Sequence, residues 1–230
     1  RLRCDWSSDV CSSDLLLVNP NQLELAEYKP KLNVGDQGRV AREFAWNEQP
    51  RNVMAINVET GKLLWQKESK VAPLSLSADG ERVYFHDGEK VVCLNGKDGK
   101  PVWSSEPVSR RRNVTFNFGP RLVVYKDVVL FAGGDKIMRS LDSKTGKLLW
   151  TATHDPSGYQ SPQDLLIAGG TVWSAPTTRT ADSGIYTGRN PRTGEVVAKF
   201  GPKVDTYWFH HRCYLDRKST RLNSSHTSIS

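Results

Sequence analysis

Residues 57–65 of the chain are NVETGKLLW, and residues 142–150 are DSKTGKLLW. Two weaker copies of this string occur at residues 95–103 (NGKDGKPVW) and residues 190–200 (NPRTGEVVAKF). The glycine that the copies share recurs at intervals of 38, 47 and 48 residues, as Gly61, Gly99, Gly146 and Gly194. A period of this length is typical of arrays in which each unit is one supersecondary motif that packs on the next.

Each repeat unit predicts short strands joined by tight turns. Between the first two glycines, Asp79-Gly80 and Asp87-Gly88 separate runs that are rich in β-branched and aromatic residues. Asp-Gly pairs between such runs are strong hairpin signals, because glycine adopts positive φ at little cost. The predicted strands of this unit are residues 62–66, 73–77, 82–86 and 90–94.

Two further units repeat this plan. The first predicts strands over residues 121–125, 128–132, 136–141 and 147–151, and the second predicts strands over residues 163–167, 171–175 and 185–189. Four short strands in about 40 residues match the period and content of one β-propeller blade. The predicted fold class is therefore all-β: a partial propeller of about four four-stranded antiparallel blades, which form an incomplete ring.

The repeated string has a predicted structural role. Its Thr-Gly turn reverses the chain between the last two strands of a blade, and in the following strand Leu63 and Trp65 share one face. Because neighbouring blades cover both faces of a blade, we expect both faces of this strand to be apolar and covered, with the tryptophans wedged between blades. The residues assigned to this motif are Gly61, Trp65, Gly99, Trp103, Thr145, Gly146, Trp150, Thr193 and Gly194.

Both ends of the chain can be encoded by one DNA oligonucleotide, read on opposite strands. Residues 1–15 can be back-translated into one oligonucleotide whose reverse complement, translated from its second base, encodes residues 216–230. The string resembles translated sequencing-adapter DNA. We therefore interpret residues 1–15 and 216–230 as adapter-derived, expect both to be disordered, and assign no role to Cys4, Cys11 or His226.

Between these ends, the repeat divides the chain. Residues 16–52 lack the repeat and are predicted to be an irregular lead-in or the end of a preceding blade. Residues 53–215 are predicted to be the propeller repeats.

Composition excludes several classes of protein. The net charge is +7, and the two adapter-like ends hold five of the basic and four of the acidic side chains, so the remainder is mildly basic. Its only basic cluster, Arg110-Arg111-Arg112, is predicted to be a solvated loop, because no aromatic-basic stacking module for nucleic acid accompanies it.

No apolar run approaches the roughly 18 residues of a transmembrane helix. Cys93 and Cys213 lie in no paired motif, so neither a disulfide scaffold nor a zinc ribbon is predicted.

The repeat Asp/Asn-x-x-Thr-Gly-Lys-x-x-Trp resembles the tryptophan docking motif of PQQ-binding-like β-propeller repeats, the quinoprotein and BamB-like superfamily. The match is specific in the first three copies, whereas Lys199-Phe200 follow Gly194 where a tryptophan is expected. Residues 206–214 resemble a bacterial branch distinct from both the quinoprotein dehydrogenases and BamB. Rings of this family have about seven or eight blades, so the resemblance implies that the four units are about half of a ring.

The resemblance also suggests an enzymatic alternative, a PQQ- and calcium-dependent quinoprotein dehydrogenase. In that branch a catalytic Asp and calcium-bound PQQ lie at the ring axis, and a disulfide between adjacent cysteines packs on the cofactor. The sequence has no Cys-Cys pair, and no Asp matches the catalytic one. We therefore assign no catalytic residue and expect no cofactor, with PQQ and calcium reserved for this alternative.

Few other residues suggest chemistry. His211 and Cys213 would share one face of a strand and are weak metal candidates, but two ligands are too few for a closed site. His86 and His154 have no nucleophile partner and are predicted to be surface or turn histidines. Asp135 and Asp182-Ser183-Gly184 are interpreted as turns, because the alternating acidic ligands of a calcium loop are missing.

The leading functional prediction is a non-catalytic propeller scaffold that binds a protein or small molecule on one face. The resemblance implies an extracytoplasmic or periplasmic location, with no nucleic acid and no transmembrane segment. The alternatives are a fragment of a quinoprotein dehydrogenase and an accessory propeller fused to a separate enzyme. A propeller fold alone does not choose among them.

Overall fold

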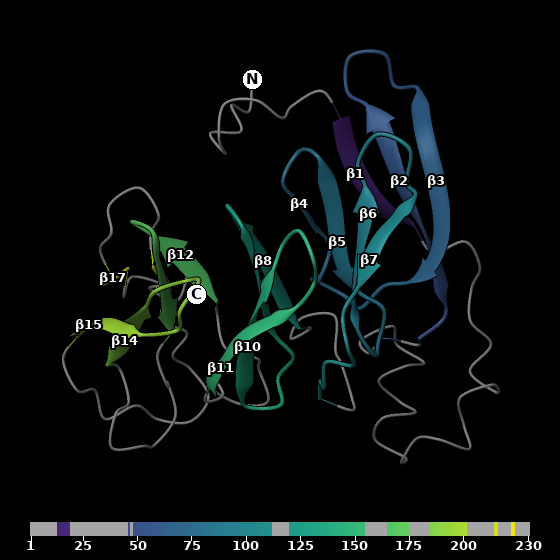
Figure 1. The fold of residues 1–230 in the computed structure, drawn as a ribbon. Helices are drawn as coiled ribbons and strands as arrows, with labels where there is room; N and C mark the ends of the chain where they lie inside the picture. Colours follow the sequence, from purple (N-terminus) through teal and green to yellow (C-terminus); the bar gives the residue numbers. More distant parts are fainter. Residues whose placement is uncertain are drawn as a thin grey trace, which may run out of the picture. The chain divides into compact units, whose positions relative to one another are not determined.

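The computed structural model describes residues 13–18, 46, 48–111, 120–154, 165–174, 185–201, 214–215 and 222–223. The chain divides into two compact units, Arg1–Phe116 and Asn117–Ser230. Every regular element in the described residues is a β-strand (Figure 1). No helix in these ranges is long and apolar enough to cross a membrane.

The first unit contains two antiparallel sheets. One has the order β1-β2-β3, with bounds Ser13–Val18, Pro50–Asn57 and Leu63–Lys70. The other has the order β4-β5-β6-β7, with bounds Ser77–Ala78, Arg82–His86, Val91–Asn95 and Pro101–Ser104. The second sheet is a meander, because each strand pairs with the next one in sequence.

The second unit contains two four-stranded meanders. The first consists of β8 (Arg121–Tyr125), β9 (Val128–Ala132), β10 (Ile137–Asp142) and β11 (Leu148–Thr153). The second consists of β12 (Leu166–Ala168), β13 (Thr171–Ser174), β14 (Tyr186–Arg189) and β15 (Val196–Phe200). A short pair, β16 (Tyr214–Leu215) and β17 (Leu222–Asn223), follows. The predicted fold class, all-β with four-stranded antiparallel blades, is confirmed.

One predicted strand is not formed as expected. The predicted strand over residues 73–77 is wrong, because β4 is only Ser77–Ala78. The segment before it is a turn in which Leu74 has a φ of 62° and the Ser75 hydroxyl donates to the carbonyl of Ala72 at 2.7 Å. Pro73 has no N–H with which to continue a ladder.

Two short strands include residues of the adapter-like ends. Residues 13–15 belong to β1, which pairs with β2 in a register that places Leu15 opposite Ala55. Residues 222–223 form β17. An unpaired strand edge offers free N–H and C=O groups, and a β-prone run such as residues 15–18 (LLLV) can pair with it whatever its origin.

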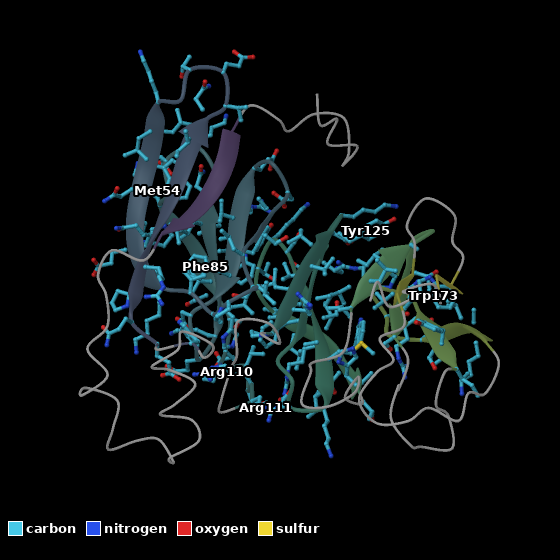
Figure 2. All side chains as sticks on the ribbon, turned by 180° about the vertical axis from the view of Figure 1, so that it is seen from behind. Met54, Phe85, Arg110, Arg111, Tyr125 and Trp173 are labelled. Atoms are coloured by element: carbon cyan, nitrogen blue, oxygen red, sulfur yellow. The ribbon has the colours of Figure 1, made fainter. Side chains whose placement is uncertain are left out.

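The core of the first unit lies between its two sheets. Alternate residues of β2 are buried, and Val53 and Ala55 are fully inaccessible. They belong to one cluster with Trp65 of β3 and with Phe85 and Leu94 of the second sheet; Phe85 is labelled in Figure 2. The two-residue period of β2 thus directs one face of the strand at the neighbouring blade.

In the second unit the inner strands are buried more completely than the edges. All five residues of β9 are buried. Val128 and Leu130 pack in one cluster with Met138 of β10 and Val172 of β13, which joins the two blades.

The last strand of each blade is less covered than predicted. Leu63 and Leu64 on β3 are 53% and 50% exposed, and Leu148 on β11 is 56% exposed. Val196 and Val197 on β15 are also exposed. The expectation that both faces of these strands are covered is therefore wrong here. The reason is that β3, β11 and β15 are edge strands, where a neighbouring sheet covers less surface.

The turn that the repeat encodes has the same hydrogen bonds in all four copies. The glycine N–H donates to the carbonyl four residues earlier at 2.8–2.9 Å. The side-chain oxygen of that earlier residue accepts from backbone N–H groups inside the turn; these residues are Asn57, Asn95, Asp142 and Asn190. The shared glycines have φ between 67° and 76°, where a side chain costs about 1–2 kcal/mol.

Arg192 connects two of these turns. Its Nη1 lies 2.6 Å from Oδ2 of Asp127, and its Nη2 lies 3.3 Å from Oδ2 of Asp142. Burial opposes ionisation of Asp142. Hydrogen bonds from the Thr145 hydroxyl, from the backbone of Lys144 and Thr145, and from Arg192 outweigh burial and lower the pKa of the Asp142 carboxyl.

We expect Asp142→Asn to reduce the loss in free energy of unfolding that the chain shows on acidification. A carboxylate whose pKa is lowered by folding stabilises the fold at pH values above its unfolded pKa, which is near 4. This contribution is lost as the pH falls from the unfolded pKa through the folded pKa. Asparagine occupies this position in the other three turns, so the variant keeps the Oδ1 acceptor. Its stability at about pH 7 should change by less than about 1 kcal/mol, since Arg192 is half exposed.

Urea unfolding at about pH 7 and pH 3.5 measures this effect. The asparagine variant should lose less stability on acidification than the wild-type chain. Asp142→Ala is the matched control, because it removes the acceptor and should cost about 1 kcal/mol or more even at neutral pH. Equal losses on acidification in the wild type and the asparagine variant would contradict the assignment.

Candidate functional site

Trp65 rests on the turn of the next blade. A Cβ at Gly99 would lie 2.6 Å from Cε3 of Trp65, so the ring occupies the space that a side chain would need. The indole Nε1 donates to the carbonyl of Gly96 at 2.7 Å. We call this combination, the bare Cα of the turn glycine and the carbonyl three residues before it, an indole seat.

Trp150 occupies an equivalent indole seat in the second unit. A Cβ at Gly194 would lie 2.7 Å from Cγ of Trp150, and the Trp150 Nε1 donates to the carbonyl of Pro191 at 2.8 Å. In both cases the last strand of one blade is attached to the following blade. These contacts are structural and leave no polar group of the ring open to a ligand.

A polar pocket lies in the first unit, at the end of β3 away from the repeated turn. Its volume is about 410 Å³. The residues that line it are Glu48, Ser69, Lys70, Asp87, Gly88, Glu89 and Arg110. They come from four places in the chain: the start of β2, the end of β3, the β5–β6 turn and the segment after β7.

Arg110 is held firmly at the side of this pocket. Its Nε donates to the carbonyl of Gly88 at 2.8 Å, its Nη1 to the carbonyl of Arg111 at 3.0 Å, and its Nη2 to Oε1 of Glu48 at 2.7 Å. The guanidinium also stands over the ring of Trp46, 5.0 Å from its centroid. The Arg110 side chain is only 11% exposed, so the prediction of a solvated arginine loop is wrong for this residue (Figure 2). The reason is a partner 62 positions earlier in the chain.

The buried His86 ring contacts two of the segments that form this pocket. Its ring is fully buried, Nδ1 accepts from the N–H of Gly88 at 3.0 Å, and Nε2 lies 2.9 Å from the carbonyl of Val108. Because Nδ1 accepts, the ring is neutral with its hydrogen on Nε2. His86 therefore joins the β5–β6 turn to the segment that carries Arg110. It was predicted to be a surface or turn histidine; it lies beside a turn, but its ring is buried.

The pocket is suited to binding charged or polar groups. It presents carboxylates from Glu48, Asp87 and Glu89 together with the cationic ends of Lys70 and Arg110. The hydroxyl of Ser69 donates to the carbonyl of Lys70 at 3.1 Å and is therefore not directed at a base. The mixture of charges favours electrostatic recognition of a ligand.

A comparison with known protein families shows to which family the chain belongs. A sequence model described as outer membrane protein assembly factor BamB matches residues 49–199, which include all four copies of the repeated turn. The chain belongs to the BamB family. The resemblance to PQQ-like and BamB-like propeller repeats is thereby confirmed.

Individual relatives of this BamB-family chain include enzymes. It is 29% identical over 114 residues to the quinoprotein alcohol dehydrogenase PedH of Pseudomonas putida, which covers 43% of the chain and 19% of that protein. It is 27% identical over 169 residues to the dehydrogenase subunit of a quinone-dependent alcohol dehydrogenase of Gluconobacter oxydans, which covers 53% of the chain and 22% of that protein. The chain thus spans about a fifth of the length of these curated relatives.

The solved structures with which the chain was compared include a BamB protein. BamB from Moraxella catarrhalis has a TM-score of 0.48 and 17% identity, and the similarity covers 66% of this chain and 49% of the BamB chain.

The remaining motif residues of the BamB-family repeat lie on strands and turns. Trp103 on β7 is half-buried, and its ring centroid lies 5.9 Å from that of Tyr84. Burial and the hydrogen bond to Asp79 raise the pKa of Tyr84. Cys93, next to this cluster on β6, is a free buried cysteine, and burial raises the pKa of its thiol to about 12. This thiol is therefore not an ionised nucleophile at neutral pH.

The predicted metal candidates are not brought into any site that the structure describes. His211 and Cys213 lie outside the described residues, as do Arg112 and Asp182. In the described ranges, no group of three or more His, Cys, Asp or Glu side chains could hold a metal ion. The carboxylate of Asp135 accepts hydrogen bonds from Arg139 at 2.7 and 3.2 Å. His154, predicted to be a surface or turn histidine, is buried.

The sequence contains only a weak signal for the pocket of this BamB-family chain. Arg110 stands out in the arginine cluster, but Glu48 and Trp46 lie in a region without the repeat. Among the other lining residues, only Asp87-Gly88 belongs to a recognisable sequence pattern, which is that of a turn. The pocket was missed because its walls come from segments that have no common pattern.

Proposed function

We propose that this chain is a non-catalytic binding propeller whose polar pocket receives a protein partner or a small charged ligand. The observation that supports this proposal is the fixed guanidinium of Arg110, which Glu48, Gly88 and Trp46 hold in one orientation. A charged group that is already fixed loses little conformational entropy when a ligand binds. Lys70 and Glu89 at the exposed rim add one charge of each sign.

The family supports a protein partner and an extracytoplasmic location. The family is described as an assembly factor for outer membrane proteins, and an assembly factor acts by binding other polypeptides. The mixed charges of the pocket suit a polypeptide segment that itself carries both an acidic and a basic side chain. We propose that such a segment binds between Arg110 and Lys70.

Site-specific photo-crosslinking in the source organism tests the proposal. A benzoylphenylalanine in place of Ser69, which lines the pocket, is expected to give an adduct of one discrete mass. The same group in place of Glu68, the preceding residue on β3, should give none, because Glu68 does not line the pocket. Adding Arg110→Ala to the Ser69 variant should remove the adduct. An adduct that survives Arg110→Ala, or equal adducts at both positions, would show that the pocket is not the binding site.

The second candidate function is a fragment of a quinoprotein dehydrogenase, which the similarity to two alcohol dehydrogenases favours. The described residues contain no group of three or more His, Cys, Asp or Glu side chains that could hold a metal ion. Incubation of the full-length protein with PQQ and Ca²⁺, followed by a dye-linked assay with primary alcohols, separates the two candidates. Turnover that depends on PQQ would overturn the non-catalytic proposal, and no turnover is the expected result.

A further inference from the structure

Two turns of the first unit have nearly the same sequence, Asp79-Gly80-Glu81-Arg82 and Asp87-Gly88-Glu89-Lys90. In each turn the N–H of the aspartate donates to the carbonyl three residues later, at 3.2 Å and 3.0 Å. In each turn Oδ1 of the aspartate accepts from the N–H groups two and three residues later, at distances between 2.8 and 3.1 Å. The two carboxylates are therefore held in the same way by one of their two oxygens.

The two turns differ at the other carboxylate oxygen. Oδ2 of Asp79 accepts from the Tyr84 hydroxyl at 2.7 Å. The residue at the same distance after the second turn aspartate is Val92, whose side chain has no hydrogen-bond donor. In the part of the chain that the structure describes, Oδ2 of Asp87 has no hydrogen-bond or ion-pair partner.

This free oxygen is an exception among the aspartates whose side chains the structure describes. Apart from Asp79 and Asp87, each of them has a cationic group within 3.3 Å of Oδ2. The cations are Lys100 for Asp98, Arg139 for Asp135, and Arg192 for both Asp127 and Asp142. The turn aspartates of this chain therefore bind a cation at Oδ2 where no tyrosine is placed to donate.

Asp87 lines the polar pocket, and the charges of the pocket favour a cation at this oxygen. The lining contains three carboxylates and two cationic groups. Glu48 neutralises Arg110 through their ion pair at 2.7 Å, which leaves Asp87 and Glu89 against Lys70 alone. The remaining part of the pocket thus has an excess of negative charge.

Asp87 is also the carboxylate of this pair that is held in place. Glu89 is exposed, whereas Asp87 is half-buried and fixed by two backbone N–H groups. A fixed carboxylate loses little side-chain entropy when it binds a ligand. Its orientation can therefore select one kind of group.

We propose that Asp87 determines the specificity of this pocket by selecting the cationic group of an arginine or lysine side chain on the bound polypeptide. This inference rests on the proposed binding function and adds to it the position of the basic group, which donates to Oδ2 of Asp87. Glu89 supplies a second carboxylate at the rim. Lys70 is a competing cation of the chain itself, so it weakens the binding of a positive group and attracts an acidic neighbour on the same segment.

Titration of the full chain with Nα-acetylarginine methylamide, followed in ¹H–¹⁵N spectra, tests for the cation. A saturable shift of the backbone amides of Glu89 and Lys90 is expected, because these N–H groups donate to Oδ1 of Asp87. The same probe with citrulline in place of arginine has nearly the same shape without the charge. It should bind about fivefold more weakly.

Variants of the chain locate the site. Asp87→Asn removes the charge, keeps the Oδ1 acceptor of the turn and should weaken binding of the arginine probe about fivefold. Asp98→Asn is the matched control with no expected effect, because Oδ1 of Asp98 also accepts a turn N–H but Asp98 does not line the pocket. Lys70→Gln removes the competing cation and should strengthen binding about twofold. Equal binding of the arginine and citrulline probes, unchanged affinity in Asp87→Asn, or weaker binding in Lys70→Gln would overturn the proposal.

The photo-crosslinking experiment separates this inference from the proposed function. Asp87→Asn added to the Ser69 crosslinking variant should lower the amount of adduct about fivefold. An adduct that persists at the same level would overturn the role of Asp87 and leave the binding function intact. If no adduct forms while the arginine probe still binds at Asp87, the polypeptide partner is rejected and the cation specificity of the pocket is retained.

Discussion

Trp65→Ala is expected to lower the free energy of unfolding by about 3–5 kcal/mol. The ring is 8% exposed and belongs to the core cluster that joins the two sheets of the first unit. Its removal leaves a cavity over Gly99 and leaves the carbonyl of Gly96 without the indole donor. Since small domains are stable by only about 5–15 kcal/mol, the loss is a large fraction of the total.

Urea denaturation followed by far-ultraviolet circular dichroism measures this loss without relying on tryptophan fluorescence. Leu64→Ala is the control, because Leu64 precedes Trp65 on the opposite face of β3 and is half exposed. Its cost should be within about 0.5 kcal/mol. Similar costs for the two variants would show that Trp65 does not connect the blades.

Gly99→Ala and Gly61→Ala should differ in cost although they make the same change in the same turn. Both glycines have φ near 68°, so alanine costs about 1–2 kcal/mol at each. Only at Gly99 does the new methyl group overlap a ring, that of Trp65. Overpacking of this kind adds about 1–3 kcal/mol.

A double-mutant cycle isolates the contribution of the ring. In a Trp65→Ala background the overlap is absent, and Gly99→Ala should then cost about as much as Gly61→Ala. The coupling free energy obtained from urea midpoints and slopes should equal the extra cost seen in the single variant. A cycle without coupling would mean that the cost arises from the backbone conformation alone.

Most of the strand order could be predicted from the sequence, because it depends on local chemistry. Residues 82–86, 121–125 and 128–132 were predicted as strands, and they are β5, β8 and β9 without any shift of their bounds. Alternating β-branched residues and glycine-containing turns act over a few residues, so a single sequence is enough to recognise them. The region before β4 failed because its turn is stabilised by Ser75 and by a positive φ at Leu74, neither of which has a sequence signature.

The candidate site could not be predicted to the same extent. The arginine cluster was recognised, but its interpretation as a solvated loop was wrong, because the contacts that bury Arg110 come from Trp46 and Glu48. His86 was assigned to the surface or a turn, and the contact that a local pattern could not show is that of its Nε2 with the carbonyl of Val108, 22 positions later. A local pattern contains no information about a neighbour that lies 20 to 60 residues away.

The sequence alone determined the repeat, the turn glycines and the choice of asparagine or aspartate before them, because each is required by the backbone conformation of a few adjacent residues. Only the tertiary structure decided which turn glycines are covered. Among the described residues, Trp65 covers Gly99 and no atom lies within 4 Å of a Cβ placed at Gly61, although the two turns are alike. It also decided that Arg110 and Glu48 form one wall of a pocket. The ring over Gly99 and the Arg110–Glu48 ion pair both depend on which distant segments of the chain pack together.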